Sequence, residues 1–259
     1  MTSVLTRQNR KSSFRRILGI RFFVGTAAQA VQMVENGGLV VVPAAPALKN
    51  IVSDLGYRDA LLQSDLAITD SSFMVLAWNL IQKDSIARLS GLEYLVELLA
   101  SLRVRPKRCF WIMASEASAT KNLAWLRTQG IEVSPDDVYV APRYGAHIED
   151  TNLLEQAKER RPDHVIVTLG GGTQEKLGLY LKKNVKPLPA VHCIGAAIAF
   201  LSGDQVRIPL WADRLYLGWL FRCLTEPRRY FPRYWSARKT LPLILRYREK
   251  LPGYSGQLR

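Results

Sequence analysis

The first side chain that could do chemistry is an aspartate directly after a short apolar run. Asp70 follows Leu66–Thr69, which is typical of a buried strand, and Ser71 and Ser72 can begin a helix after it. A carboxylate at the end of a strand can act as a general base on a substrate hydroxyl. An N-cap role for Asp70 fits the local sequence equally well, so both interpretations stay open.

A glycine-rich turn is the second candidate. Leu169–Glu175 reads LGGGTQE, and its glycines separate an apolar run from a helical pattern. Backbone N–H groups of Gly170 and Gly171 could approach an anion there, and Gln174 could bind a sugar or a base. The segment is neither a GxGxxG motif nor a P-loop, so a plain strand-to-helix connection is the alternative.

A third segment, Arg88–Glu93, places an arginine just before an expected helix. Ser90 can cap this helix, and Glu93 stands at the capping-box position. A solvated arginine beside a cap explains the segment by itself. Arg88 becomes a candidate ligand only if the fold brings it to Asp70.

No group of residues has the spacing of a metal site or of a Ser-His-Asp triad. The histidines and cysteines are scattered: His147, His164, His192, Cys109, Cys193 and Cys223. The cysteines lie in apolar contexts, so we expect buried free thiols. These spacings offer no ligand set for a metal ion.

The charge of the chain is strongly positive. Its 259 residues carry a formal net charge of +14, and the basic residues concentrate at the two ends. This balance favours a polyanionic partner, which could be nucleic acid, a phosphorylated substrate or anionic lipid. Because no nucleic-acid-binding motif is present, we do not expect nucleic acid.

Arginine and aromatic residues alternate near the C-terminus. Ile194–Trp235 begins with an apolar, glycine-containing stretch and ends in spaced Arg, Trp and Pro residues. Planar guanidinium groups bind phosphates in a bidentate manner, and the aromatic side chains suit an apolar neighbour. A solvated charge run is the alternative interpretation of this tail.

The elements that must position these residues alternate between strand and helix. The apolar runs predict strands at Arg16–Val24, Leu39–Val42, Leu66–Thr69, Cys109–Met113, Ile131–Val133, Val138–Val140, His164–Leu169 and Val191–Ile194. The 3.6-residue patterns predict helices at Thr26–Asn36, Ala47–Ser53, Phe73–Leu80, Leu92–Leu102, Ser118–Gln129, Asn152–Arg160, Gln174–Lys182 and Leu215–Leu224. This order predicts an α/β fold, a Rossmann-like and mainly parallel sheet flanked by helices. Its ligands should bind at the carboxyl ends of the strands.

Three segments follow from this pattern. Residues 1–15 form a basic N-terminal arm, residues 16–206 an α/β core, and residues 207–259 a basic, aromatic helical appendage that Pro232 and Pro242 interrupt. The N-terminus lacks an apolar signal core, and no run reaches the roughly 18 apolar residues that span a bilayer. We expect a cytoplasmic protein or one bound to the inner membrane surface.

Together these blocks resemble the WecG/TagA/CpsF family of bacterial glycosyltransferases (glycosyltransferase family 26). The resemblance runs in order from about Arg16 to Tyr234. It is carried by the RILGI segment at Arg16–Ile20, Asp70, Arg88–Gly91, Gly170 with Gln174-Glu175, and the final series Gly195-Ala196, Gly203, Arg207, Pro209, Trp211, Trp219, Arg222, Glu226-Pro227, Arg229 and Arg233-Tyr234.

The resemblance implies transfer of a sugar from a UDP-sugar to a polyprenyl-diphosphate-linked saccharide, with inversion and without an obligatory metal, at the cytoplasmic membrane face. It implies that Asp70 is the base and that an anionic membrane surface is a further partner. A homo-oligomer is left open. The substrate-binding residues that it implies are Arg88, Gly170, Gly171, Gln174, Glu175, Gly195, Arg207, Arg214, Arg222, Arg229 and Arg233.

The chain departs from the family pattern at several positions. Val42–Pro46 contains neither residue of the usual Thr-X-Asn, Ser71 replaces a glycine, Gly172-Thr173 replaces Pro-Lys, and Gly218 replaces a glutamate. Loss of Thr and Asn removes polar groups expected to face the nucleotide sugar. The alternative is therefore a weakly active or inactive relative that binds nucleotide-sugar or serves as a scaffold in a membrane complex.

Overall fold

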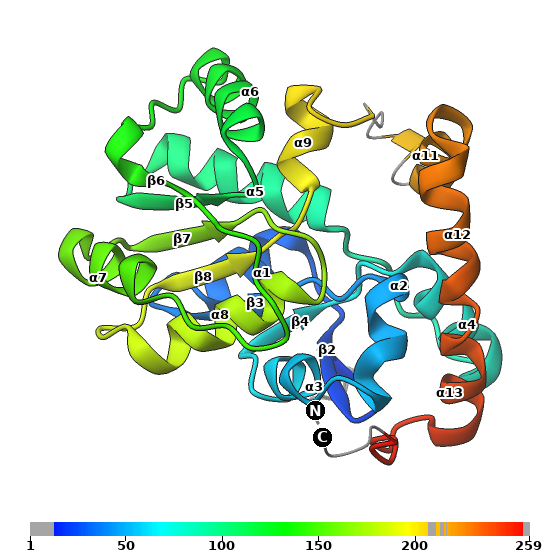
Figure 1. The fold of residues 1–259 in the computed structure, drawn as a ribbon. Coiled ribbons are helices and arrows are strands. Elements are labelled where there is room, and N and C mark those ends of the chain that lie inside the picture. Colours follow the sequence, from blue (N-terminus) through cyan, green and yellow to red (C-terminus); the bar gives the residue numbers. More distant parts are fainter. Residues whose placement is uncertain (1–12, 207–210, 213–214, 216, 256–259) are drawn as a thin grey trace, which may run out of the picture.

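The computed structural model describes residues 13–206, 211–212, 215 and 217–255. An eight-stranded sheet of order β1-β2-β4-β3-β8-β7-β5-β6 lies at its centre (Figure 1). β1 and β2 are antiparallel, and the remaining neighbours are parallel. The strands are β1 (Phe14–Ile17), β2 (Ile20–Phe23), β3 (Gly38–Val41), β4 (Leu66–Ile68), β5 (Cys109–Met113), β6 (Val138–Val140), β7 (His164–Val167) and β8 (Ala190–Cys193). The predicted α/β class with a mainly parallel sheet is confirmed.

Helices follow most strands. They are α1 (Ala27–Met33), α2 (Ala45–Leu48), α3 (Leu55–Leu62), α4 (Ser72–Gln82), α5 (Gly91–Val104), α6 (Glu116–Thr128), α7 (Thr151–Arg160), α8 (Thr173–Asn184), α9 (Ala197–Ser202), α11 (Gly218–Thr225), α12 (Pro227–Ala237) and α13 (Thr240–Tyr247), with short 3₁₀ turns at Lys49–Val52 and Pro135–Asp137. Among the described residues, no helix is long and apolar enough to cross a membrane.

The sheet is covered on both faces. One apolar cluster joins it to α2, α3, α4, α7, α8 and α13, and a second joins it to α1, α5, α6 and α9. Successive side chains of a strand point to opposite faces, so Val41 belongs to the first cluster and Val40 to the second. Burial on both faces explains why β3 is a continuous apolar run.

The carboxyl ends of four strands are level with one another. Val41 of β3 pairs with Ala67 of β4 and with Cys193 of β8, which in turn pairs with Val167 of β7. The loops that follow these strands carry Asp70, the 42–46 segment, Gly195 and Gly170. This register brings the predicted site segments to one edge of the sheet.

Two strand predictions were wrong. Arg16–Val24 is a hairpin rather than one strand, because Leu18 and Gly19 turn the chain with φ values of 51° and 80°. Their N–H groups donate to the carbonyls of Arg248 and Glu249, so distant contacts hold this turn. Ile131–Val133 forms no strand, and α3 was not predicted.

The C-terminal helices pack against the α/β core. α12 contacts α2, and α13 contacts both α2 and α4. The Thr240 hydroxyl donates to the Ala45 carbonyl at 3.3 Å, and Ile244 is fully buried in the first apolar cluster. Figure 1 shows these helices as a column beside the carboxyl edge of the sheet. Pro232 lies inside α12 rather than interrupting it.

Candidate active site

A cavity of about 450 Å³ lies between the carboxyl edge of the sheet and the C-terminal helices. Its walls come from the loop after β3, the start of α4, the segment before α5, and α11 and α12. The lining residues are Ala44, Ala45, Pro46, Asp70, Ser71, Ser72, Phe73, Leu76, Arg88, Gly218, Trp219, Arg222, Cys223, Phe231, Tyr234, Trp235 and Ala237. Segments far apart in the sequence therefore form one pocket.

Asp70 lies in this cavity and is not a helix cap. Ser71 caps α4, because its hydroxyl accepts from the Met74 N–H at 3.1 Å. Oδ1 of Asp70 accepts from the Gly91 N–H at 2.9 Å, at the first turn of α5. The helix N-terminus favours a negative charge at this point. Among the described residues Oδ2 has no hydrogen-bond partner, so it is available to a ligand.

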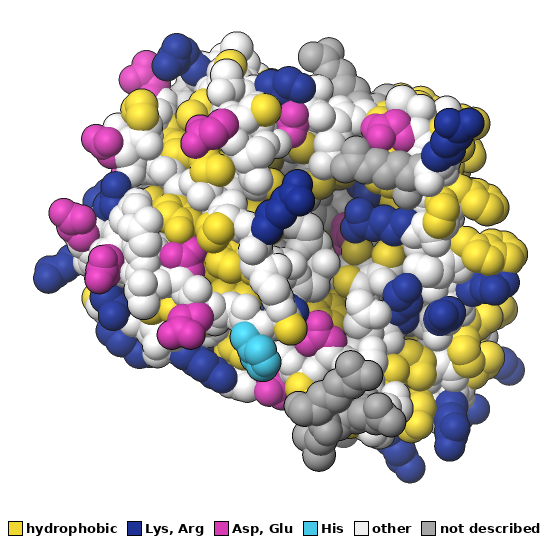
Figure 2. Space-filling view, in the orientation of Figure 1, with side chains coloured by type: hydrophobic (Ala, Val, Ile, Leu, Met, Phe, Trp, Pro, Cys, Tyr) yellow, Lys and Arg dark blue, Asp and Glu magenta, His cyan; other side chains and the backbone are white. Residues whose placement is uncertain are grey.

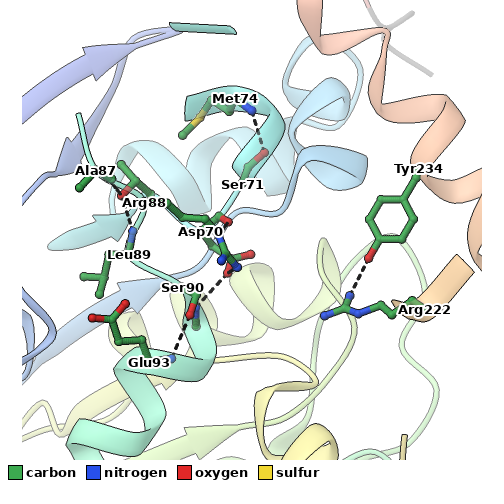
Figure 3. Close-up of polar contacts among 12 residues, drawn as sticks. Asp70, Ser71, Met74, Ala87, Arg88, Leu89, Ser90, Glu93, Arg222 and Tyr234 are labelled. Atoms are coloured by element: carbon green, nitrogen blue, oxygen red, sulfur yellow. Dashed lines mark hydrogen bonds and ion pairs between the residues drawn. The ribbon is translucent and has the colours of Figure 1, made fainter. Parts of the chain in front are cut away.

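Arg88 contacts Asp70 twice (Figure 3). Its Nε donates to the Asp70 carbonyl at 2.6 Å, and its terminal nitrogen lies 3.5 Å from Oδ1. The Thr69 hydroxyl fixes this segment, since it donates to the Ala87 carbonyl and accepts from the Leu89 N–H, each at 3.0 Å. The arginine is thus part of the site rather than a solvated surface residue.

The segment after Arg88 turns into α5 through the predicted cap. The Ser90 hydroxyl accepts from the Glu93 N–H at 3.0 Å. This contact confirms the capping role of Ser90, and it orients the Gly91 N–H toward Asp70.

Arg222 enters the cavity from α11. One terminal nitrogen donates to the Tyr234 hydroxyl at 2.8 Å, and the guanidinium stacks 4.1 Å from the centre of the Phe200 ring. Its Nε is buried without a hydrogen-bond partner among the described residues. Figure 3 shows Arg222 and Tyr234 across the site from Asp70. Burial raises the pKa of the Tyr234 phenol, which therefore stays protonated at neutral pH.

The rest of the cavity wall is largely apolar and aromatic. Trp219, Phe231 and Trp235 contribute rings from α11 and α12, and Phe73 and Leu76 face the cavity from α4. The segment after β3 that runs into α2 adds only alanine and proline. The cavity therefore combines a few charged groups with a hydrocarbon-compatible surface.

The glycine turn lies beside this cavity rather than in its wall. Oε2 of Glu175 accepts from the Gly172 N–H at 2.6 Å, and Oε1 accepts from Nε2 of Gln174 at 3.1 Å. Glu175 is fully buried, and burial raises its pKa to about 7. A carboxyl of the protein thus already occupies the Gly172 N–H. Oε1 of Gln174 has no partner among the described residues.

The predicted site residues fall into three sets. Asp70, Arg88 and Arg222 line the cavity. Five others lie at the ends of β7 and β8 outside the cavity wall: Gly170, Gly171, Gln174, Glu175 and Gly195. The two sets are adjacent, because a Cβ on Gly91 would lie 3.6 Å from the Ile194 carbonyl and 3.8 Å from Oδ1 of Asp70.

The other arginines predicted as substrate ligands are not among the described residues that line the cavity. Arg207 and Arg214 lie outside the described residues, and of Arg229 only the backbone, within α12, is described. Arg233 is exposed on α12 and does not line the cavity. Tyr234, which lines the cavity, was not predicted as a site residue from the sequence. Its spacing with Phe231 and Trp235, at i, i+3 and i+4, could have indicated one face of a helix.

No ligand set for a metal converges in the described part of the chain, where no three His, Cys, Asp or Glu residues cluster. The cysteines are free, but only Cys193 is buried, whereas Cys109 and Cys223 are half-buried, so the expectation of three buried thiols was wrong. A metal-independent reaction stays a prediction.

The fold and this cavity define an α/β enzyme with a Rossmann-like sheet and a carboxylate–arginine pocket at its carboxyl edge. Comparison with known families matches residues 15–254 to the glycosyl transferase WecG/TagA/CpsF family. The chain belongs to this family and is a glycosyltransferase.

Individual relatives agree with the family assignment. The chain is similar to N-acetylglucosaminyldiphosphoundecaprenol N-acetyl-beta-D-mannosaminyltransferase of Bacillus spizizenii, with 25% identity over 231 residues, which cover 87% of this chain and 86% of the relative. A Staphylococcus aureus protein of the same name is 21% identical over 222 residues, which cover 82% and 85%. A Bacillus subtilis protein of that name is 25% identical over 180 residues, which cover 69% of this chain and 68% of the relative.

Proposed function

We propose that this enzyme transfers a sugar, with inversion, from a UDP-sugar to a polyprenyl-diphosphate-linked saccharide in the synthesis of a cell-envelope glycan. The observation that carries the proposal is the Asp70 carboxylate, which lines a cavity that is also lined by Arg222. A base and a phosphate ligand are the two groups that such a transfer requires. The relatives' names support an acceptor of N-acetylglucosaminyl-diphospho-undecaprenol type.

The reaction needs one proton transfer and one displacement. Asp70 takes the proton of the acceptor hydroxyl, whose oxygen attacks the anomeric carbon of the donor sugar. The bond between that carbon and the UDP oxygen breaks as the new glycosidic bond forms, and UDP leaves as the anion. Arg222 stabilises the charge on a diphosphate, while Arg88 holds Asp70 in position.

The cavity lining supports a lipid-linked acceptor at a membrane surface. Large apolar side chains are exposed on α11, α12 and α13, including Trp219, Phe231, Trp235, Leu241 and Leu245. Figure 2 shows hydrophobic and basic side chains side by side along this edge of the molecule. Basic residues near an anionic leaflet each contribute about 1 kcal/mol to binding. We infer peripheral association with the inner face of the membrane.

The assay that tests the function is transfer from a panel of radiolabelled UDP-sugars to a polyprenyl-diphosphate-N-acetylglucosamine acceptor in detergent or vesicles. We expect lipid-linked product with at least one donor, and persistence of that activity in a metal chelator. Absence of product across the panel would contradict the proposal.

A second candidate is a relative that binds nucleotide-sugar without transfer. It is favoured by one observation, namely that Ala44, Ala45 and Pro46 line the cavity and offer it no polar side chain, whereas the resemblance led us to expect Thr and Asn in this segment. Calorimetric binding of UDP together with absence of transfer would support this candidate. Product formation would exclude it.

A further inference from the structure

We propose that Tyr234 is a catalytic residue, which donates its phenolic hydrogen to a substrate diphosphate that Arg222 binds at the same time. The inference deepens the proposed function and rests on it for the identity of the ligand. Tyr234 stands on α12, and its hydroxyl faces the cavity opposite Asp70 (Figure 3).

The hydrogen bond between the two residues fixes the role of each atom. Arg222 can only donate, so the Tyr234 oxygen accepts from it at 2.8 Å. The phenolic hydrogen then remains free, and it has no acceptor among the described residues. A phenol that stays protonated offers this hydrogen to an anion in the cavity.

Arg222 also has N–H donors that no described residue accepts from. Its guanidinium face is occupied by the Phe200 ring, one terminal nitrogen is occupied by Tyr234, and its buried Nε has no partner in the described chain. A buried donor without a partner is costly, so this arginine is not placed here for stability alone. The stack and the hydrogen bond hold the guanidinium in place, and its second terminal nitrogen, which has no partner in the described chain, is left to bind an anion.

The charges of the cavity favour an anion beside these two residues. Among the described lining residues, Asp70 and Arg88 form an ion pair, which leaves Arg222 as the uncompensated charge. The glycine turn next to the cavity is less suitable, because the Glu175 carboxyl already occupies the Gly172 N–H. The diphosphate therefore binds at Arg222 and Tyr234 rather than at the turn.

Two substrates of the proposed reaction carry a diphosphate, the UDP-sugar and the polyprenyl-linked acceptor. Binding of UDP and of farnesyl diphosphate to the wild type and to Tyr234→Phe, measured by calorimetry, distinguishes them. We expect about 10-fold to 100-fold weaker binding of at least one probe to the variant, as for loss of a hydrogen bond to a charged group. Loss for UDP assigns the site to the donor, and loss for farnesyl diphosphate assigns it to the acceptor.

The matched control is Tyr230→Phe, one helical turn earlier in α12. Tyr230 is buried, its hydroxyl donates to Gln205, and it does not line the cavity. This variant should bind both probes as the wild type does. Thermal unfolding of both variants checks that the ring packing is retained, since each substitution removes a single oxygen.

The outcomes separate this inference from the proposed function. Unchanged binding of both probes by Tyr234→Phe, an equal loss in Tyr230→Phe, or a wild type that binds neither probe would overturn the role of Tyr234. A selective loss of binding in Tyr234→Phe supports that role even if the wild type transfers no sugar, in which case only the proposed function fails.

Discussion

Arg88 holds Asp70 by two contacts. Nε of Arg88 lies 2.6 Å from the backbone carbonyl oxygen of Asp70, and a terminal nitrogen of Arg88 lies 3.5 Å from Oδ1 of the Asp70 carboxylate. With the Gly91 N–H on the same carboxylate oxygen, these contacts orient the group. Oδ2 is the oxygen that remains for a substrate. The arrangement suits a base whose reactive oxygen must be fixed relative to an acceptor hydroxyl.

Asp70→Asn should abolish most of the transfer activity and leave the fold intact. The asparagine carbonyl can still accept from the Gly91 N–H, but the amide cannot take a proton. A general base contributes about 10²-fold to 10⁴-fold to rate, so kcat should fall by that factor, with UDP affinity unchanged. Single-turnover transfer and calorimetry measure the two quantities.

The control for this variant is Asp59→Asn, which removes one exposed carboxylate on α3, outside the cavity wall. Its transfer rate should match that of the wild type. If Asp70→Asn retained full turnover, Asp70 would not be the base.

Arg88→Lys should lower both turnover and stability although it keeps the positive charge. A lysine has no planar fork that can reach the Asp70 carbonyl and its carboxylate together. We expect about a 10-fold loss in kcat and a lower Tm, as for loss of one hydrogen bond to a charged group. Steady-state kinetics and thermal unfolding measure these effects, and a lysine variant equal to the wild type in both would contradict the role of Arg88.

Most of the core elements could be predicted because their causes are local. The Thr26 cap of α1, the buried run of β3 and the strand Cys109–Met113 are all set by neighbouring residues. The hairpin at Leu18-Gly19 was missed because the C-terminal segment, which lies far away in the sequence, stabilises it. No local pattern contains that contact.

The site was predictable where a strand end places a residue, as for Asp70. The sequence could not show that Arg88 reaches back to Asp70, or that α12 brings Tyr234 to the same cavity. Both depend on how distant segments pack. Glu175 was predicted as a substrate ligand from its motif, and that role stays a prediction. The motif could not show that its carboxyl is fully buried and accepts from Gly172 and Gln174.

Glu175 should make the protein less stable as pH rises through neutrality. Its pKa in the folded state, about 7, lies above the ordinary value of 4.5, so the folded state binds the proton more tightly. Stability is therefore highest below about pH 4.5 for this group and falls as the pH rises to 7, by about 3 kcal/mol in all. Urea unfolding of the wild type and of Glu175→Gln at pH 5 and pH 8 measures the difference.

The variant lacks this titration, so its stability relative to the wild type should increase between pH 5 and pH 8. Other groups titrate equally in both proteins and cancel in the comparison. A difference that did not change with pH would show that the Glu175 carboxyl is not perturbed.

A buried pair of histidines should make the protein less stable as the pH falls, which is the opposite of the pH dependence expected for Glu175. Nδ1 of His192 lies 2.8 Å from the Tyr94 hydroxyl, and its Nε2 lies 2.9 Å from Nδ1 of His164. Burial lowers the pKa of both histidines below the ordinary value of 6.5. Their contribution to the free energy of unfolding is present above pH 6.5. It is lost as the pH falls below this value, by at most about 1.4 kcal/mol per pH unit for each ring.

His164→Gln should reduce the loss of stability between pH 7 and pH 5, measured by urea unfolding against the wild type. Tyr94→Phe is the control, because it removes the hydroxyl that contacts His192 and leaves both titrating imidazole rings. An acid sensitivity that was identical in the wild type and in His164→Gln would exclude a contribution from this histidine.

The basic residues of the C-terminal segment should divide into two functional groups. Arg207, Arg214 and Arg222 are expected to serve the diphosphate, and Arg238, Lys239, Arg246 and Arg248 the bilayer. The structure describes Arg222 in the cavity, whereas the latter four are exposed. Replacement of Arg238, Lys239 and Arg246 by Gln should weaken binding to anionic vesicles by about 100-fold, since each contributes about 1 kcal/mol. Transfer to a short, soluble acceptor should not change.

A control with the same change in charge is the Gln replacement of Arg127, Lys158 and Lys183, which are exposed on α6, α7 and α8. Its vesicle binding, measured by sedimentation in low and high salt, should stay near that of the wild type. Arg222→Gln should show the reverse behaviour, with impaired transfer even to the soluble acceptor and vesicle binding retained. If Arg222→Gln and the C-terminal triple variant lost the same property, the division would be wrong, because one surface would then serve both ligands.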